Sequence, residues 1–374
     1  MADHLLSTPS GRPRARALGI PLAGTPGRWN AITDVAGVEV GYTTLVEGES
    51  VRTGVTAVFP RGRDGVGVPC AAGTHSFNGN GEMTGTAWIA ESGALNSPIV
   101  ITNTAAVGPA HAGVVEWLKR NRPELTTQWA LPVVAETYDG RLNDLYGGHV
   151  RPGHAVAALD AARIGPVEEG SVGGGTGMIC HGFKGGSGTA SRVLGYGPDH
   201  YTVAAFVQAN HGARHELTIG GTPIRFAEPS GAPEPPPAAP RGAGSVIVVL
   251  ATDAPLLPGQ CGALARRATL GIGRTGTTGS HFSGDLFLAF STANAGALTS
   301  TFPAGPVGDD EYEHLRFVPW GRIDAFYEAA VQAVEEAVLN ALVANDDMTG
   351  FRGSHVPALP HDVVRGAFSA PGKI

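Results

Sequence analysis

One junction near the middle of the chain limits the folds that this sequence can adopt. Residues 229–240 are rich in proline, which lacks the amide hydrogen that a central strand needs. Residues 246–250 (Val-Ile-Val-Val-Leu) form an uninterrupted apolar run, typical of a strand buried on both faces. Between them lie the small residues Gly-Ala-Gly at 242–244, followed by Ser245. The sequence therefore predicts a proline-rich tether that delivers a serine to the entry of a core strand.

This placement suggests chemistry for Ser245. Its hydroxyl could attack the carbonyl of Gly244, pass the chain through an ester, and leave Ser245 as a new N-terminus after hydrolysis. The freed amine, with a pKa of about 8, could then accept the hydroxyl proton at neutral pH. That is the logic of an N-terminal-nucleophile hydrolase. Taken alone, however, Gly-Ser is more typical of an ordinary loop.

Composition narrows the class of protein. The formal charge of −7 and the absence of a Lys/Arg block argue against nucleic-acid binding, and they suit a substrate that carries an ammonium group. The three cysteines are scattered, so neither a disulfide framework nor a zinc cage is expected. Without a signal-peptide pattern or an apolar run of membrane-spanning length, we expect a cytoplasmic protein with no membrane segment.

Strand and helix patterns alternate along the chain. Apolar runs and alternation predict strands at residues 32–42, 54–59, 98–102, 129–135, 201–208, 246–250 and 285–291. Helical spacing predicts helices at residues 88–94, 108–120, 154–164, 259–268 and 323–344. Prolines prevent regular structure in residues 1–30, and the polar, glycine-rich residues 73–85 are expected to line a site. A single α/β domain with four α/β/β/α layers is the preferred architecture.

Several familiar motifs fail in their context. Residues 271–276 match GxGxxG but follow a predicted helix instead of a strand, which argues against dinucleotide binding. Residues 177–184 lack the Lys-Ser/Thr ending of a P-loop. His211 and His215 have metal-ligand spacing, but Gly212 makes a helix unlikely there, so structural histidines are favoured. The GxSxG motif of α/β-hydrolases does not occur, which argues against that class. A Ser/His/Asp triad is still possible, but no feature of the sequence selects one histidine for it.

Three polar groups lie at the ends of predicted strands. Ser283 and Asp285 are two residues apart, so they share a face of the strand, where the carboxylate could polarise the hydroxyl and help to orient Ser245. Asn210 follows a strand, and its amide could donate to an oxyanion. Strand capping for the pair and a turn for the asparagine are the better interpretations of each feature alone.

Glu136 and Tyr138 alternate along an extended segment and would also share a face. One offers an anion and the other a phenolic donor. A surface pair is about equally consistent with these two residues alone.

Two blocks of the sequence stand out, Gly-Ser-Val-Ile-Val-Val-Leu-Ala-Thr-Asp-Ala-Pro at 244–255 and Ser-Gly-Asp-Leu-Phe-Leu-Ala-Phe-Ser-Thr-Ala-Asn at 283–294. With them, the chain resembles the self-processing L-aminopeptidase/D-esterase family, which includes the β-peptidyl aminopeptidases. Further matches occur at 30–42, 136–140, 173–178 and 208–212, in the same order over nearly the whole length.

The resemblance implies a precursor cut between Gly244 and Ser245 into an α chain (1–244) and a β chain (245–374) that stay associated. It implies an α/β/β/α sandwich like that of N-terminal-nucleophile hydrolases with different strand connectivity, assembled as a tetramer of processed heterodimers. By position, the resemblance implies that Ser245 is the nucleophile and that Asn210 is an oxyanion donor. It implies that Ser283 and Asp285 support Ser245. It also implies that Tyr138 helps to bind the acyl intermediate and that Glu136 holds the substrate's amino group.

The expected activity is release of N-terminal residues from short peptides, amides or esters through an acyl-enzyme, without a metal or other cofactor. Before cleavage the Ser245 nitrogen is an amide, so Ser283 and Asp285 are the candidate base for processing. β-Peptide-cleaving members tend to carry glutamate where this chain has Asp285, which favours α-amino-acid substrates. The alternatives are a β-peptidyl aminopeptidase of the same fold, an acyltransferase of the ornithine acetyltransferase type, and an uncleaved scaffold protein.

Overall fold

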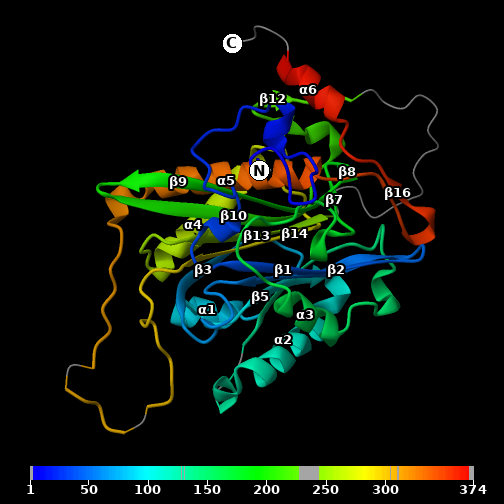
Figure 1. The fold of residues 1–374 in the computed structure, drawn as a ribbon. Helices are drawn as coiled ribbons and strands as arrows, with labels where there is room; N and C mark the ends of the chain where they lie inside the picture. The colour runs from blue at the N-terminus through cyan, green and yellow to red at the C-terminus, as the bar shows by residue number, and fades with distance from the viewer. Residues whose placement is uncertain are drawn as a thin grey trace.

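A computed structural model describes residues 3–127, 129, 131–226, 244–303, 305–309 and 311–369. Two β-sheets lie face to face at its centre (Figure 1). The first has four strands in the order β1 (Glu39–Glu47), β2 (Val51–Phe59), β5 (Ile99–Asn103) and β6 (Val133–Thr137). The second has six, in the order β4 (Ala94–Leu95), β3 (Cys70–Gly79), β14 (Ser283–Ser291), β13 (Gly244–Thr252), β10 (Asp199–Asn210) and β9 (Gly186–Tyr196).

Helices cover the outer face of each sheet. On the four-stranded sheet lie α2 (Val107–Asn121) and α3 (Pro152–Asp160), and on the six-stranded sheet lie α4 (Pro258–Gly273) and α5 (Asp324–Val343). The buried apolar residues form three clusters, one between the two sheets and one under each pair of helices. The predicted four-layer α/β/β/α sandwich is therefore confirmed.

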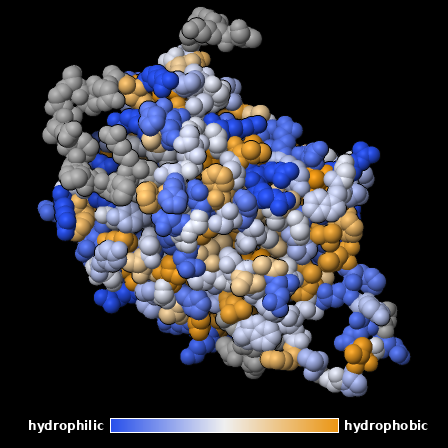
Figure 2. All heavy atoms as spheres, turned by 180° about the vertical axis from the view of Figure 1, so that it is seen from behind, coloured by the Kyte–Doolittle hydropathy of each residue, from blue (hydrophilic) through white to orange (hydrophobic). Residues whose placement is uncertain are grey.

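Shorter elements complete the described chain. They are the helices α1 (Thr86–Ser92) and α6 (His361–Ser369) and the two-stranded pairs β7 (Ile179–Cys180) with β8 (Phe183–Lys184), β11 (Thr218–Ile219) with β12 (Thr222–Pro223), and β15 (Met348–Thr349) with β16 (His355–Val356). None of the helices in the described ranges combines the length and apolar character needed to cross a bilayer. On the face shown in Figure 2, apolar side chains are interspersed with polar ones.

The core strand expected after the proline-rich tether is confirmed. All nine residues of β13 are buried, because β13 pairs antiparallel with β10 on one side and parallel with β14 on the other. Side chains that alternate along β13 therefore enter two different cores. Val246, Val248 and Leu250 pack toward α4 and α5, whereas Ile247, Val249 and Ala251 pack between the sheets. The tether at 229–240 lies outside the described residues.

The predicted helix at 323–344 is also confirmed, and its apolar stripe is buried. More of α5 is buried than one stripe accounts for, because the N-terminal arm packs across it. Within that arm, the only helical turn in the described residues is a 3-10 turn over Ala15–Leu18. Arg16 of this turn makes an ion pair of 2.7 Å with Glu336, whose side chain is fully buried.

Two of the segments that differ from the sequence prediction lie at 32–42 and 73–85. The strand expected at 32–42 begins only at Glu39, because the Asp34 carboxylate accepts backbone hydrogen bonds from Trp29 and Ala31 and holds a 3-10 turn. Within the polar segment 73–85, residues up to Gly79 form the end of strand β3. A side chain at Gly73 would collide with the backbone of α4, so helix packing accounts for this glycine.

Candidate active site

Ser245 lies second in β13, and its side chain is directed toward the four-stranded sheet. Its Oγ accepts hydrogen bonds from the backbone amide of Tyr138, at 3.0 Å, and from Nδ2 of Asn210, at 3.3 Å. Tyr138 directly follows β6, so the site is formed where the ends of strands from both sheets meet. The serine is 2% exposed. The hydroxyl therefore sits in a buried pocket of N–H donors.

Asn210 is the last residue of β10 and is paired with Ser245 in the strand register. Its Oδ1 accepts from the backbone amide of Ile179 at 2.8 Å, and its Nδ2 also donates to the Tyr138 carbonyl at 2.9 Å. The Ile179 N–H can only donate, so the side-chain atom that it contacts must be the oxygen, and the Tyr138 carbonyl can only accept, so its partner must be the nitrogen. These two partners therefore fix the Nδ2 end of the Asn210 amide toward Ser245 Oγ.

Gly244 is held close to the same asparagine. A Cβ at Gly244 would lie 2.6 Å from the Asn210 carbonyl oxygen and 3.2 Å from the Cα of His211. Real side-chain carbons do not approach that closely, so only glycine fits here. The peptide bond between Gly244 and Ser245 is consequently packed against the residue that donates to Ser245 Oγ.

Ser283 and Asp285 share a face of β14, as predicted. Ser283 Oγ donates to the Asp285 carboxylate at 2.5 Å, and Asn78 Nδ2 donates to its other oxygen at 2.8 Å. Burial raises the pKa of Asp285. The hydrogen bonds from Ser283 and Asn78 act in the opposite direction but are weaker than the effect of burial, so the pKa is raised overall.

The pair lies on the opposite side of the sheet from the Ser245 hydroxyl. Asp285 is paired with Val246 in the register and accepts a hydrogen bond from the Val246 backbone amide. Within the described residues, neither Ser283 nor Asp285 hydrogen-bonds to Ser245 Oγ. The two side chains therefore adjoin the backbone just after the nucleophile and do not touch its oxygen.

Glu136 is buried, 3% exposed, so a surface pair with Tyr138 is excluded. One carboxylate oxygen accepts from the Glu82 backbone amide at 3.0 Å, and the other accepts from the Thr104 hydroxyl. Burial raises its pKa, and these two hydrogen bonds oppose that shift. Tyr138 differs, because its side chain is 38% exposed and its contacts to Ser245 and Asn210 are made by its backbone.

The polar segment at 73–85 does line this region. Asn78 contacts Asp285, and the Glu82 amide contacts Glu136. A Cβ at Gly81 would lie 3.0 Å from the Glu136 carboxylate and 3.1 Å from the Cα of Gly284. The segment therefore passes between Glu136 and the start of β14, where there is room only for backbone.

The rejected motifs have structural explanations. Gly271 and Gly273 lie inside α4, and a side chain at Gly271 would collide with Val334 of α5. The GxGxxG match thus reflects close helix packing. His211 is buried, and desolvation together with the nearby His181 lowers its pKa to about 3. His215 lies apart in a 3-10 turn.

One cluster of side chains was not predicted from the sequence. Cys180 and His181 lie next to His211, and the possible metal-ligand atoms of the three residues are within 4.8 Å of one another. Adjacent cysteine and histidine at 180–181 was the only signal in the sequence, and nothing in the spacing linked it to residue 211.

Known proteins resemble the chain over nearly its whole length. The model for peptidase family S58 matches residues 30–356. β-Peptidyl aminopeptidase BapA of Sphingosinicella microcystinivorans is 47% identical over 371 residues, covering 94% of this chain and 91% of the relative.

Two solved structures share the fold. The L-aminopeptidase D-Ala-esterase/amidase of Ochrobactrum anthropi, a prototype for the serine aminopeptidases and a variant of the Ntn-hydrolase fold, is 45% identical with a TM-score of 0.86, covering 96% of this chain and 98% of that one. A β-aminopeptidase of Burkholderia sp. is 46% identical with a TM-score of 0.86, covering 95% and 98%. The chain therefore belongs to peptidase family S58, and it is a hydrolase of the serine aminopeptidase type with the Ntn-hydrolase fold.

Proposed function

We propose that the chain cuts itself between Gly244 and Ser245 and then releases N-terminal residues from short peptides, amides or esters that carry a free amino group. One observation carries the proposal. Ser245 stands at the entry of a central strand, next to a glycine that tolerates no side chain, with its Oγ 3.0 Å and 3.3 Å from two N–H donors. The names of the relatives, which are aminopeptidases and an esterase/amidase, support the same substrate class.

Processing begins with an attack of Ser245 Oγ on the Gly244 carbonyl carbon. The hydroxyl proton passes to the Ser245 nitrogen as the C–N bond breaks, which leaves an ester between Gly244 and Oγ and a free amine. Water then hydrolyses the ester, so that Gly244 ends in a carboxylate and Ser245 regains its hydroxyl. Two N–H donors close to Oγ can stabilise the negative charge that develops on the attacked carbonyl.

Ser283 and Asp285 are assigned to the nitrogen side of this reaction. They lie beside the backbone at Val246 and away from Oγ, so they are placed to act on the amide that becomes the amine. A buried carboxylate whose pKa is raised by burial is a better proton acceptor than an ordinary aspartate. The pair is therefore proposed as the base that stabilises the proton arriving on the Ser245 nitrogen as the C–N bond breaks.

In the processed enzyme the new amine takes over as the base. It accepts the Ser245 hydroxyl proton while Oγ attacks the substrate carbonyl, and it returns that proton to the leaving amine or alcohol. Asn210 and the Tyr138 amide stabilise the oxyanion, and water releases the acyl group. Release of Gly244 from its place against the Asn210 carbonyl opens the space in which the substrate carbonyl binds.

Glu136 is proposed to hold the substrate's ammonium group. Its carboxylate is buried at the end of β6, two residues before Tyr138, and its partners are two donors, the Glu82 amide and the Thr104 hydroxyl. A carboxylate has lone pairs for more than two donors. An ammonium group would then supply the opposite charge that a buried anion needs.

The two products are expected to stay together. The six-stranded sheet contains β3, β4, β9 and β10 from the α chain and β13 and β14 from the β chain. Both junctions between the chains are antiparallel ladders, β10 with β13 without interruption and β3 with β14 with one irregularity after Asp285. Separation would expose strands buried on both faces. Assembly of these heterodimers into a tetramer is part of the proposal, and light scattering of the processed protein tests it.

The preference between α- and β-amino acids needs its own measurement. Asp285, in place of glutamate, favours α-amino acids, whereas relatives named β-peptidyl aminopeptidase and L-aminopeptidase have nearly the same identity to this chain, 47% and 45%. A panel of p-nitroanilides of L-alanine, D-alanine and β-alanine decides between them. We expect higher kcat/KM for the α-amino acids, and a preference for β-alanine would reverse that assignment.

The main test is intact mass spectrometry of fresh protein together with N-terminal sequencing. We expect two chains, one starting Ser-Val-Ile-Val, and we expect Ser245→Ala to remain one inactive chain near 38.2 kDa. A wild-type protein that persists as one species would favour the scaffold alternative. Transfer of an acetyl group to an amino-acid acceptor in preference to water would favour the acyltransferase.

A further inference from the structure

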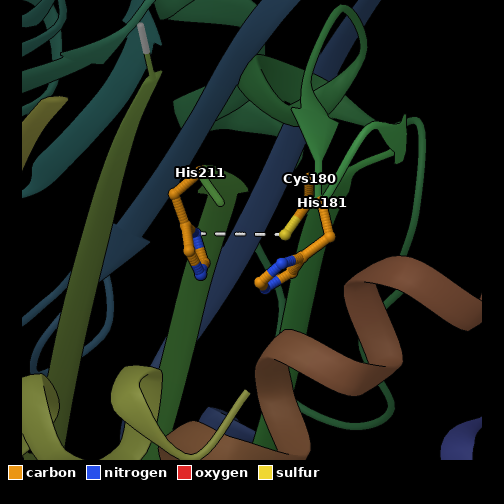
Figure 3. A group of neighbouring side chains, drawn as sticks. All are labelled: Cys180, His181 and His211. Atoms are coloured by element: carbon orange, nitrogen blue, oxygen red, sulfur yellow. Dashed lines mark hydrogen bonds between the residues drawn. The ribbon is translucent and has the colours of Figure 1, made fainter. Parts of the chain in front are cut away.

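Three buried side chains converge on the α4/α5 side of the six-stranded sheet (Figure 3). Cys180 ends β7, His181 begins the following turn, and His211 directly follows β10. Their exposed fractions are 0%, 0% and 4%. The Cys180 Sγ is 4.0 Å from Nδ1 of His211, and the possible ligand atoms of all three lie within 4.8 Å of one another.

The backbone holds this arrangement in place. The His181 amide donates to the His211 carbonyl at 2.8 Å, which ties the two segments together. His181 has a φ of 49°, a left-handed conformation that is costly for a residue with a side chain. Gly212 has a φ of 80°, and a Cβ there would lie 2.4 Å from the His181 ring. Two left-handed residues therefore bring the imidazoles together.

The polar atoms of the cluster are poorly satisfied. Nε2 of His211 is buried without a hydrogen-bond partner among the described residues. Within the described part of the chain, the His181 ring contacts the Ala213 carbonyl through Nδ1 at 3.2 Å and the Thr275 hydroxyl through Nε2 at 3.4 Å. Buried imidazoles are nearly always hydrogen-bonded or bound to a metal. The cluster therefore holds one buried imidazole nitrogen, Nε2 of His211, without a partner among the described residues, beside a thiol and a second imidazole, which is the character of a binding site.

We propose that Cys180, His181 and His211 bind one thiophilic divalent ion of the Zn²⁺ and Co²⁺ class. Thiolate and imidazole are the ligands that such ions prefer, and three protein ligands leave a fourth position for water. The ion displaces the thiol proton, which leaves with solvent, and forms one bond to sulfur and two to nitrogen.

The ligand atoms need to move only a short way. Metal–sulfur and metal–nitrogen bonds of about 2.3 Å and 2.0 Å place tetrahedral ligand atoms roughly 3.3–3.6 Å apart. The cluster has Sγ and Nδ1 at 4.0 Å, and its widest separation is 4.8 Å. His211 also lines a cavity of about 110 Å³, shared with Val246 and Asp285. That volume can hold water beside the His211 ring.

Binding at this site would act on the active site, an effect that rests on the function proposed above. Ile179 precedes Cys180, and its amide donates to Oδ1 of Asn210, the residue before His211. Drawing Cys180 and His211 together changes the segments that orient the Asn210 amide. Occupancy is therefore expected to lower kcat more than it changes KM.

The first experiment measures binding without using activity. Full-length processed protein is titrated with Co²⁺ at pH 7.5 under reducing conditions and followed by absorption. We expect one ion per chain, a near-ultraviolet thiolate-to-cobalt charge-transfer band, and strong visible bands of tetrahedral geometry. An octahedral spectrum without the sulfur band would overturn the proposal, whether or not the protein is an aminopeptidase.

Two cysteine variants make the assignment specific. Cys180→Ala should weaken Zn²⁺ binding by at least about a hundredfold, since it removes the thiolate ligand. Cys261→Ala changes an equally buried cysteine in α4 that lies outside the cluster, and it should retain the site. Equal affinity in the two variants rules the site out. The wild-type spectrum decides the question if Cys180→Ala does not fold.

Inhibition is measured as the ratio of kcat with and without Zn²⁺ in each protein. A ratio that falls in the wild type and in Cys261→Ala but not in Cys180→Ala supports coupling to Asn210. If the kcat ratio falls equally in Cys180→Ala, the coupling between the metal site and Asn210 is refuted. The binding of the ion is then judged from the absorption spectra alone. A processed enzyme that has no peptidase activity would contradict only the proposed function.

Discussion

Asn210 Nδ2 lies 3.3 Å from Ser245 Oγ, and the register of β10 and β13 sets the two residues directly opposite each other. The same asparagine accepts from Ile179 through Oδ1, so its donor end is fixed toward the serine. In the processed enzyme proposed above, this strand pair would supply the nucleophile from one chain and the oxyanion donor from the other. Preorganised donors of this kind contribute strongly to acyl transfer because they do not have to reorient during the reaction.

Asn210→Asp is expected to lower kcat by about 10²–10³, with a smaller change in KM. The aspartate keeps an oxygen for the Ile179 amide but removes the N–H donor and places a negative charge near the oxyanion. Steady-state kinetics on the processed fraction, quantified by intact mass, give the measurement. A kcat within threefold of the wild type would remove Asn210 from the oxyanion site.

Gly244→Ala is expected to block processing. Its Cβ would lie 2.6 Å from the Asn210 carbonyl, so the scissile peptide must move away from Ser245 Oγ. Gly79→Ala is the matched control, because a Cβ at that strand glycine meets nothing within 4 Å. The fraction cleaved is followed by denaturing gel electrophoresis over days. Rapid cleavage of Gly244→Ala would show that the close contact does not position the bond.

Glu136→Gln is expected to reduce kcat/KM for substrates with a free amino group by roughly 30- to 1,000-fold, since loss of one partner of a buried charge pair costs about 2–4 kcal/mol. Glutamine retains an acceptor for the Glu82 amide but has no negative charge. N-acetylated substrates serve as the comparison, because they lack the ammonium group. If free and acetylated substrates lose activity equally, Glu136 supports the fold and does not bind the amine.

Asp285→Glu tests whether Asp285 favours α-amino-acid substrates. Asp285 lines the cavity of about 110 Å³, which leaves room for one more methylene group, so we expect the variant to fold and to process. The ratio of kcat/KM for β-alanine to that for L-alanine p-nitroanilide should rise. Ser283→Ala is the companion variant, since it removes the 2.5 Å hydrogen bond to Asp285 without lengthening the carboxylate. An unchanged ratio would mean that Asp285 does not set the preference.

The layers of the fold could be predicted where burial leaves a pattern in the sequence. The apolar run of β13 and the stripe of α5 were recognised because both elements pack large side chains into cores. Strand β9 was missed, since its first six residues, Gly186–Ser191, are all glycine, serine, threonine or alanine. A side chain at Gly188 would collide with the α5 backbone, so the strand has small residues where the helix lies against it.

The site was predictable only in part for a similar reason. Residues at strand ends, such as Asn210 and Asp285, could be identified from their positions in the chain. The backbone amide of Tyr138 could not, because any residue at that position offers an N–H. The side of the sheet occupied by Asp285 was also hidden. It depends on the pairing of Val246 with Asp285 and on the irregular register after Asp285, which no local pattern reveals.

Asp139 gives a prediction about stability and pH. It directly follows Tyr138 and is 1% exposed. One carboxylate oxygen accepts from Asn143 at 3.1 Å, and the other has no hydrogen-bond partner among the described residues. Burial raises the pKa of Asp139 to about 7, against smaller opposing effects of its hydrogen bonds.

Because the folded pKa lies above the unfolded value, the folded chain keeps a proton that the unfolded chain releases from about pH 4 upward. The stabilisation is complete below that pH and is lost as the pH rises toward 7, by about 1.4 kcal/mol per pH unit. Asp139→Asn removes this loss. The variant should therefore become more stable relative to its parent as the pH rises from 5 to 7, and the difference should level off above 7.

Urea unfolding at pH 5, 6, 7 and 8 measures this difference. The Ser245→Ala background is used, because an uncleaved chain unfolds without dissociation of two fragments. Asp346→Asn, at a side chain that is 80% exposed, is the matched surface control for the same substitution. A free-energy difference for Asp139→Asn that stays constant from pH 5 to pH 8 would show that Asp139 is ionised in the folded chain throughout, and that the cost of its burial is met by the partners it already has.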